Sequence, residues 1–424
     1  MAVTSARGMR DFLPRDKEHR DSLLATIGDT YLRHGFEPME TPAMEERDRL
    51  HSGLGGDNEK LSFQVLKRGM SVEDLHQATS VDELSDLGLR FDLTVPLARF
   101  YASHHASLPS VFRSFHTGPV WRAERPQKGR YRQFVQCDID ILGEESSLAE
   151  VEILVATADV LNRLGVKGWS FRVNDRRLLT ELLSAAGIAP EDHPSALITL
   201  DKLDKVGGEG VLAELSERLP TGWSTELVAA VLGGGAPGFE PSTIAGLMGN
   251  TQAARDAAVE LVAWVSQVVA LLPEDSVVWD PTLVRGMGYY TSSIVEISHP
   301  ELGGSLGGGG RYDGMIGRFL GKNVPAMGLS LGFERLLDVV PSAPLIHPNR
   351  VALVMEGDQG GAAAMVLKMH LVDSGHTVRL VSGSRNMRAV YDRLVADGFS
   401  KVADVHGSAG DVRRVEDLIW RELG

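Results

Sequence analysis

Cysteine is almost absent from this chain of 424 residues, since Cys137 is its single thiol. One cysteine cannot form an intramolecular disulfide, which excludes a disulfide-stabilised secreted fold and is typical of a reducing cytoplasm. Long apolar runs are lacking as well, because the longest one, 257–272, is broken by Glu260, Ser266 and Gln267. A membrane helix needs roughly 18 or more apolar residues in a row, and the N-terminus has no apolar core of signal-peptide length. We therefore expect a cytoplasmic protein without a membrane span.

Several motifs of common catalytic sites are also missing. There is no Gly-x-x-x-x-Gly-Lys-Ser/Thr phosphate loop, no His-Glu-x-x-His and no Cys-x-x-Cys. His104 and His105 are neighbours, but no other ligand is spaced around them, so we predict no metal site built from protein side chains. The glycine-rich run 303–310 is not followed by the helix and acidic residue of a dinucleotide site. We interpret this run as a tight turn with several residues at positive φ.

Charge is unevenly distributed along the chain. The net charge of −14 gives no global attraction for nucleic-acid phosphates, so any such contact must come from a local basic patch. One segment, 113–132, has a local charge of +5: its only acid is Glu124, and its bases are Arg113, Arg122, Arg125, Lys128, Arg130 and Arg132. A solvated basic loop is the usual explanation of such a run. Its interleaved aromatic, glycine and proline residues favour a binding role.

The most informative pattern for the fold lies between residues 111 and 142. Segments 111–115 and 120–123 read as strand, 124–131 as a polar loop, and 132–142 alternates between apolar and polar residues. We predict two antiparallel strands joined by the basic loop. The apolar face of the second strand holds Val135, Cys137, Ile139 and Ile141, and its other face holds Phe134, Gln136, Asp138 and Asp140. Polar groups gathered on one face of such a strand predict a lined site.

The remaining elements predict a catalytic body with additions. Helices are expected at 16–34 and 92–103, and a short strand at 36–41. Ser147-Leu-Ala-Glu150 is the pattern of a capping box that opens a helix ending near Leu164. Residues from about 176 to 275 read as a mostly helical insert, and strands are expected at 169–173, 289–297 and 325–332. After a proline-rich linker, three strands each followed by a helix predict a small parallel sheet.

Six segments resemble, in order, those of class II aminoacyl-tRNA synthetases, and specifically the histidyl-tRNA synthetase family. They are Gly8-Met-Arg-Asp-Phe-Leu-Pro14, Leu89-Arg-Phe-Asp-Leu-Thr-Val-Pro96, Arg122 to Gln136, Val284-Arg-Gly-Met-Gly-Tyr-Tyr290, Gly308-Gly-Gly-Arg-Tyr-Asp-Gly314 and Gly328-Leu-Ser-Leu-Gly-Phe-Glu-Arg335. Any one of them could arise by chance, whereas six in order over residues 8 to about 340 are highly specific.

The resemblance implies an α+β fold, in which an antiparallel sheet of about six strands is flanked by helices. It implies a catalytic domain at 1–340 with the helical insert at about 176–275, a linker at 341–348, and a small C-terminal α/β domain at 349–424. That last domain is similar in element order to the family's anticodon-binding domain and is shorter at its end. The resemblance also implies a homodimer whose interface runs from Gly35 to Leu50.

The activity implied by the resemblance is ATP-dependent activation of L-histidine and its transfer to histidine tRNA, with Mg²⁺ accompanying ATP. Charge builds on phosphoryl oxygens in such a reaction, so fixed cations are needed around the triphosphate. The resemblance assigns ATP binding to Arg122, Glu124, Arg130, Phe134 and Arg335, with adenine on Phe134. It assigns histidine binding to Asp92, Leu93, Thr94, Arg122, Gln136, Asp140, Arg285, Tyr289 and Tyr290. The implied catalytic residues are Arg122, Arg285 and Arg335, with Arg285 as the electrophile.

Two departures from the family pattern keep alternatives open: the C-terminal domain is shorter at its end, and Met287-Gly288 stands where the family often has Leu-Asp. Separately, Tyr289 and Tyr290 could be strand residues, of which at most one packs in the core. A synthetase-like regulatory subunit that binds histidine is one alternative, and a paralogue that passes histidine to another acceptor is a second. The retention of Arg122, Arg285 and Arg335 favours an active enzyme over the regulatory subunit.

Overall fold

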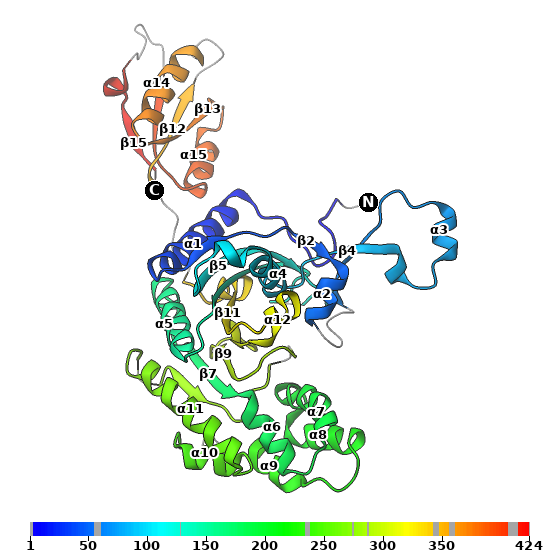
Figure 1. Cartoon of the computed structure of the whole chain (residues 1–424). Coiled ribbons are helices and arrows are strands. Elements are labelled where there is room, and N and C mark those ends of the chain that lie inside the picture. The colour runs from blue at the N-terminus through cyan, green and yellow to red at the C-terminus, as the bar shows by residue number, and fades with distance from the viewer. Residues whose placement is uncertain are drawn as a thin grey trace. The chain divides into compact units, whose positions relative to one another are not determined.

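The computed structural model describes residues 3–54, 61–127, 129–233, 238–273, 275–285, 288–341, 347–355, 361–405 and 414–423. The chain divides into two compact units (Figure 1): Met1–Asp11 with Arg20–Pro341, and Phe12–His19 with Ser342–Gly424. In the part of the chain so described, no helix combines the length and apolar character needed to span a membrane.

The larger unit is built on an eight-stranded sheet with the order β1-β5-β6-β11-β10-β9-β7-β8. Its six central strands are mutually antiparallel, as predicted, and β1 and β8 add parallel pairs at the two edges. The strands are β1 (Glu37–Met39), β5 (Phe112–Trp121), β6 (Gln133–Leu142), β7 (Ser170–Asp175), β8 (Val277–Trp279), β9 (Ser293–Ser298), β10 (Gly307–Arg311) and β11 (Ala326–Gly332). A small sheet, β2-β4-β3, is formed by β2 (Met44–Glu46), β3 (Gln64–Leu66) and β4 (Ser85–Leu89).

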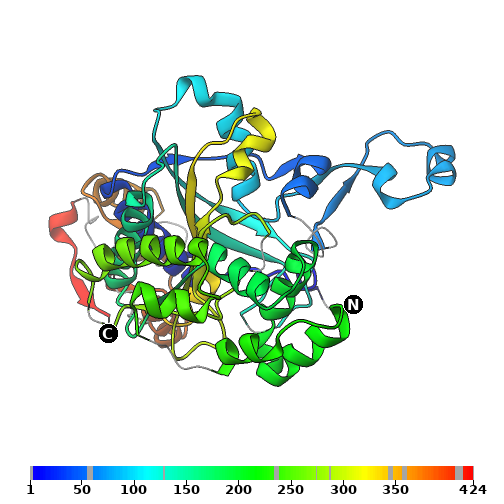
Figure 2. The ribbon, with the colours of Figure 1, turned by 60° about the horizontal axis from the view of Figure 1, so that its bottom comes forward.

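Helices cover the sheet and form the insert. Those of the body are α1 (Pro14–Arg33), α2 (Arg47–Leu54), α3 (Val72–Gln77), α4 (Thr94–His104), α5 (Leu148–Arg163), α12 (Gly314–Leu320) and α13 (Phe333–Leu336). The predicted insert is helical in the structure (Figure 2). It contains α6 (Arg176–Ala185), α7 (His193–Leu200), α8 (Leu203–Arg218), α9 (Thr225–Gly233), α10 (Pro241–Leu247) and α11 (Gln252–Val269).

The two faces of the sheet have different partners. Cys137, Ile139 and Ile141 of β6 are fully buried in a core that includes Ile27 of α1 and Leu261 of α11. This agrees with the alternation seen in the sequence, because successive strand residues point to opposite faces. The opposite face of β6 carries the polar side chains and lines a cavity. Its side chains Gln136, Asp138 and Asp140 are buried as well, so the strand is buried on both faces.

The glycine-rich run was predicted wrongly as a turn, since residues 307–310 form the central strand β10. These glycines are required by close approach rather than by turn conformation. A Cβ at Gly309 would lie 1.9 Å from the carbonyl oxygen of Gly328, and one at Gly307 would lie 2.2 Å from that of Ser330. Gly310 alone among the four has a positive φ. The neighbouring backbone therefore excludes side chains from this strand.

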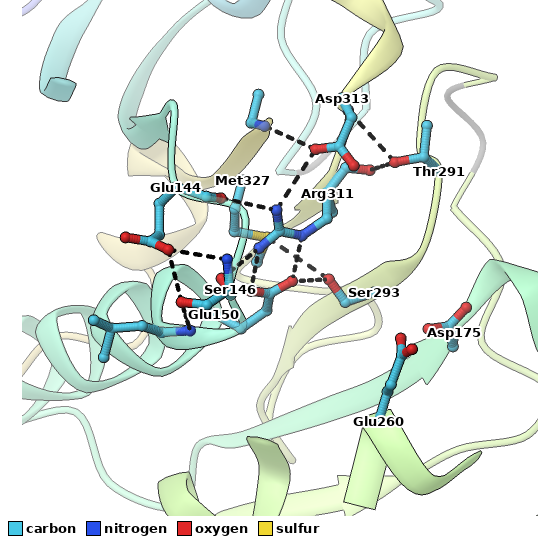
Figure 3. A network of polar contacts seen from close by, with 12 residues as sticks. Glu144, Ser146, Glu150, Asp175, Glu260, Thr291, Ser293, Arg311, Asp313 and Met327 are labelled. Atoms are coloured by element: carbon cyan, nitrogen blue, oxygen red, sulfur yellow. Dashed lines mark hydrogen bonds and ion pairs between the residues drawn. The ribbon is translucent and has the colours of Figure 1, made fainter. Parts of the chain in front are cut away.

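The capping box at α5 is also absent, although the helix begins at the predicted place. Ser147 makes no side-chain capping bond. Glu150 instead accepts hydrogen bonds from Arg311 of β10 at 2.6 and 2.7 Å and from Ser293 of β9 at 2.8 Å (Figure 3). Both charged side chains are buried. Glu150 thus accepts three hydrogen bonds, two of them from a guanidinium, where a capping box would give it one.

The smaller unit contains a four-stranded sheet with the order β13-β12-β14-β15. As predicted, the first three strands are parallel, and β15 adds an antiparallel edge. The elements of this unit are β12 (His347–Met355), α14 (Gly361–Asp373), β13 (Thr377–Ser382), α15 (Met387–Ala396), β14 (Phe399–Val405) and β15 (Trp420–Glu422). Its core is separate from that of the large sheet.

Candidate active site

A cavity of about 230 Å³ lies over the polar face of β6, β10 and β11. Every residue that we predicted to bind ATP or histidine lines this cavity, except Leu93. The lining residues from that set are Asp92, Thr94, Arg122, Glu124, Arg130, Phe134, Gln136, Asp140, Arg285, Tyr289, Tyr290 and Arg335. Leu93 is buried in the core just before α4 and does not line the cavity. Residues as far apart in sequence as Asp92 and Arg335 thus meet at one place.

One end of the cavity is acidic. Asp92 is buried, and its Oδ1 accepts a hydrogen bond from the backbone N–H of Val95 at 3.1 Å. Its Oδ2 is buried without a hydrogen-bond partner, and burial raises the pKa of this carboxyl group. An unpaired buried carboxylate oxygen is costly, so this atom suits a ligand that brings N–H donors and positive charge.

Asp140 and Tyr312 form a second polar pair at this end. The hydroxyl of Tyr312 donates to Oδ1 of Asp140 at 2.6 Å. Burial raises the pKa of Asp140 to about 7, and the hydrogen bond from Tyr312 opposes that rise. The carboxyl group fits beside β11 because residue 328 is glycine: a Cβ there would lie 1.9 Å from Oδ1.

Gln136 adds a neutral acceptor between these carboxyl groups and β11. Its Nε2 donates to the hydroxyl of Ser330 at 2.6 Å, whereas its Oε1 is buried without a partner. Asp138 is buried two residues further along β6, and burial together with Asp140 raises its pKa well above the usual value. This end therefore offers several acceptors and few donors.

The other end of the cavity is basic. The guanidinium of Arg122 lies 4.4 Å from the ring centroid of Phe91 and 5.1 Å from that of Phe134, and its Nε donates to the carbonyl of Phe91. Nη1 of Arg335 donates to the carbonyl of Ser305 at 2.6 Å. Burial lowers the pKa of Arg335, and the proximity of Arg130, Arg122 and Arg285 lowers it further. Such a cluster of cations attracts a polyanion.

Arg285 lies close enough to both ends to interact electrostatically with Tyr290 and with Arg335. Its Nη1 donates to Oε2 of Glu296 at 3.0 Å, while its Nε is buried and has no hydrogen-bond partner. The guanidinium therefore has remaining capacity to donate hydrogen bonds to a ligand in the cavity.

The two tyrosines differ from the prediction that placed them on a strand. Strand β9 begins only at Ser293, so Tyr289 and Tyr290 precede it and do not alternate between faces. Both are buried, at 8% and 7% exposure, and their ring centroids are 4.7 Å apart. Both line the cavity. Met287 lies outside the described residues, and Gly288 is exposed and forms no wall of the cavity.

The N-terminal motif supports the loop between β5 and β6. The backbone N–H of Arg132 donates to the carbonyl of Gly8 at 2.8 Å. The guanidinium of Arg10 stacks 3.5 Å from the ring centroid of Tyr131 and pairs with Glu334, to which Arg20 also donates at 2.6 and 2.7 Å. Residues around Gly8 thus hold a loop that lines the cavity without lining it themselves.

Several lining residues received no binding role in the sequence analysis. Asp138 lies on the predicted polar face, and Tyr312 and Ser330 lie in segments that carried the resemblance, so position in a motif was an available signal. Arg113, counted in the basic run, pairs with Glu152 instead of lining the cavity, and Lys128 lies outside the described residues. Within the described ranges, no group of three or more His, Cys, Asp or Glu side chains is arranged to hold a metal ion.

Comparisons with known proteins point to one family. A family model described as histidyl-tRNA synthetase matches residues 8–336. The chain is 52% identical over 416 residues to a histidine–tRNA ligase of Leifsonia xyli subsp. xyli, covering 95% of each chain. It is 38% identical over 340 residues to a histidine–tRNA ligase of Aeropyrum pernix, covering 78% of this chain and 73% of that one.

Solved structures agree at the level of the fold. A histidyl-tRNA synthetase from Nostoc sp. PCC 7120 superposes with a TM-score of 0.78 at 22% identity, covering 100% of this chain and 97% of the other. A Bacillus halodurans protein described as an ATP phosphoribosyltransferase regulatory subunit/histidyl-tRNA synthetase gives a TM-score of 0.77 at 20% identity, with 96% and 100% covered.

Proposed function

This chain belongs to the histidyl-tRNA synthetase family and uses ATP to attach histidine to tRNA, and we propose that histidyl-adenylate forms in the cavity over β6, β10 and β11. This proposal rests on one observation: a single cavity has buried hydrogen-bond acceptors at one end and clustered arginines at the other. The acceptors match an ammonium and an imidazole, and the arginines match a triphosphate.

Histidine binds at the acidic end. Oδ2 of Asp92 and Oε1 of Gln136 accept hydrogen bonds from its ammonium group, because both atoms are buried without partners. Asp140, oriented by Tyr312, accepts from the ring, and Tyr289 and Tyr290 enclose it. A site built around such acceptors discriminates strongly against an amino acid that lacks the matching donors, since these polar groups would then stay unpaired.

ATP binds at the basic end. Phe134 offers a face on which adenine stacks, while Arg122 contacts the α-phosphate and Arg130 and Arg335 contact the triphosphate tail. Arginine suits these roles because it stays charged and makes forked contacts to phosphate. The carboxylate oxygen of histidine attacks the α-phosphorus, and pyrophosphate leaves. The substrate carboxylate is the nucleophile, so no protein nucleophile is needed.

Arg285 acts as the electrophilic catalyst. Its unpaired Nε–H, and its position between the two ends of the cavity, suit a donor that contacts both the histidine carboxylate and the α-phosphate. Negative charge that develops on the phosphoryl oxygens during attack is stabilised by a guanidinium already in place.

Mg²⁺ would be bound together with ATP. Magnesium in such sites is usually held by substrate phosphates with one or two carboxylates, and the donor set fits that pattern. Glu124 lines the basic end and already lies 3.3 Å from Nη1 of Arg130. Glu124 would be the carboxylate that holds the cation, which would neutralise charge on the triphosphate.

The test is histidine-dependent ATP–pyrophosphate exchange, measured without tRNA and beside the other amino acids. We expect exchange with histidine alone, and Arg285→Ala should lose it while keeping the native circular dichroism spectrum. Near-native turnover of Arg285→Ala would contradict the role given to Arg285. No observation favours the regulatory subunit or the paralogue, and transfer of labelled histidine to purified tRNA separates both from the ligase.

The remaining proposals concern domain organisation, oligomeric state and cellular location. Residues 1–340 form the catalytic domain, and residues 349–424 contact the anticodon end of histidine tRNA. The linker predicted at 341–348 falls mostly outside the described residues, and its last two residues, 347 and 348, belong to β12. The enzyme is a cytoplasmic homodimer that pairs through Gly35 to Leu50. Sedimentation at micromolar concentration should give a dimer, and a monomer would refute the assigned interface.

A further inference from the structure

A row of directly paired residues crosses the sheet beneath Arg285. Asp138 of β6 pairs with Ser330 of β11, which pairs with Gly308 of β10. Gly308 pairs in turn with Glu296 of β9, and Glu296 with Arg172 of β7. Paired residues in antiparallel strands point to the same face. The row therefore runs from the floor of the cavity outward to Arg172, with a glycine at its centre.

Arg285 occupies the space that this glycine leaves open. A Cβ on Gly308 would lie 2.7 Å from Cζ of Arg285 and 2.8 Å from its Nη1. The next residue in the row, Glu296, accepts from that Nη1 at 3.0 Å through Oε2, and its Oε1 accepts from Nη1 of Arg172 at 3.0 Å. One carboxylate thus joins the guanidinium in the cavity to a second guanidinium outside it.

The chain of charges ends on the segment that leads into Arg285. Nε of Arg172 donates to Oδ2 of Asp280 at 2.6 Å, which gives the alternating order Arg285, Glu296, Arg172, Asp280. These four side chains are only 16 to 26% exposed. Charge-assisted hydrogen bonds at that burial are stronger than those of exposed pairs.

The same strand also holds the backbone of that segment. Asn174, two residues after Arg172 on β7, is fully buried. Its Nδ2 donates to the carbonyls of Pro281 and Leu283 at 3.3 and 3.2 Å, and its Oδ1 accepts from Nε1 of Trp279 at 3.2 Å. Strand β7 therefore fixes both the guanidinium of Arg285, through Glu296, and the main chain that precedes it.

We infer that Glu296 and Arg172 are positioning residues for adenylate formation: Glu296 holds the guanidinium of Arg285 over Gly308, and Arg172 holds Glu296. The inference rests on the proposed role of Arg285. Neither residue lines the cavity, so their loss affects the geometry of the electrophile rather than the affinity for substrates. A misplacement of about 1 Å can cost roughly 10²-fold in rate.

The test measures kcat and both KM values of histidine-dependent exchange for Glu296→Gln, which keeps shape and removes charge. We expect kcat to fall roughly 10- to 100-fold, with each KM within about 3-fold of native. Arg172→Met should lower kcat in the same direction by less, and Arg172→Lys should recover part of the loss. The matched control is Glu152→Gln, because Glu152 accepts from Arg113 at 2.9 Å with similar exposure and away from the cavity. Its kcat should stay within about 2-fold.

A double-mutant cycle decides whether Glu296 acts through Arg285. Single-turnover adenylate formation with excess enzyme is measured for Arg285→Ala and for Arg285→Ala combined with Glu296→Gln. Residues that act as a unit are non-additive, so the second change should cost nothing once Arg285 is gone. Equal losses in both backgrounds, or an unchanged kcat for Glu296→Gln alone, would overturn the inference. If Arg285→Ala itself stays active, the proposed function of Arg285 fails instead. Should Glu296→Gln not fold, the Arg172 pair of variants carries the same comparison.

Discussion

Gly328→Ala tests the histidine end of the cavity with the smallest possible change. Gly328 pairs directly with Asp140 across β11 and β6, and the added methyl carbon would lie 1.9 Å from Oδ1 of Asp140 and 3.0 Å from Cε1 of Tyr312. Ordinary van der Waals contact begins near 3.4 Å. The carboxyl group must therefore shift by about 1.5 Å, which breaks its 2.6 Å hydrogen bond from Tyr312.

The expected loss follows from that bond. A hydrogen bond to a charged group contributes about 1.5–3 kcal/mol, which corresponds to roughly 10- to 100-fold in affinity. In histidine-dependent exchange we expect KM for histidine to rise by that factor, while KM for ATP stays within about 3-fold because no arginine moves. Gly246→Ala is the control, since a Cβ in that position on α10 meets no atom within 4 Å. A folded Gly328→Ala protein with native KM for histidine would refute the assignment of Asp140 to the ring.

Three further predictions address charge and stability. Burial raises the pKa of Asp140 to about 7, so the folded protein keeps a proton that the unfolded chain releases near pH 4, and stability falls as the pH rises between these values. Asp140→Asn should therefore raise the unfolding temperature more at pH 8 than at pH 5, and equal shifts would contradict this. Glu150→Gln removes the buried carboxylate that pairs with Arg311 and leaves only Asp313, 3.6 Å away, as its counter-charge, so it should cost up to about 3–5 kcal/mol in urea unfolding; an unchanged midpoint would show the Glu150–Arg311 pair to be dispensable. Arg335→Ala should raise KM for ATP roughly 10- to 100-fold and leave KM for histidine unchanged in exchange assays. A larger change in KM for histidine than in KM for ATP would contradict this expectation.

The sequence predicted best where local pattern and tertiary burial agree. The alternation along β6 assigned Ile139 to the core and Asp140 to the opposite face, because a two-residue period has one meaning in a strand. The antiparallel pairing of β5 with β6 followed from the polar loop between them. The insert and the parallel sheet of the smaller unit followed from helical spacing and element order.

Prediction failed where a distant partner decided the outcome. No residue near Gly309 in sequence indicates that the carbonyl of Gly328 lies against it. A glycine run that forms a strand therefore has the sequence pattern of a turn. Glu150 has the spacing of a capping residue but pairs with Arg311, 161 residues later. The ionic chain through Glu296 and Arg172 was likewise invisible, because strand register across the sheet creates it.

The contact between Gly8 and Arg132 has a practical consequence for handling this protein. A Cβ at Gly8 would meet Pro126 at 2.8 Å, and Arg10 contacts Tyr131 and Glu334, so residues 8–10 are packed against a loop that lines the nucleotide end of the cavity. A protease cut within residues 8–10 would loosen that loop and lower the apparent affinity for nucleotide. Preparations should thus be checked for cleavage in this segment by ATP titration before their kinetics are interpreted.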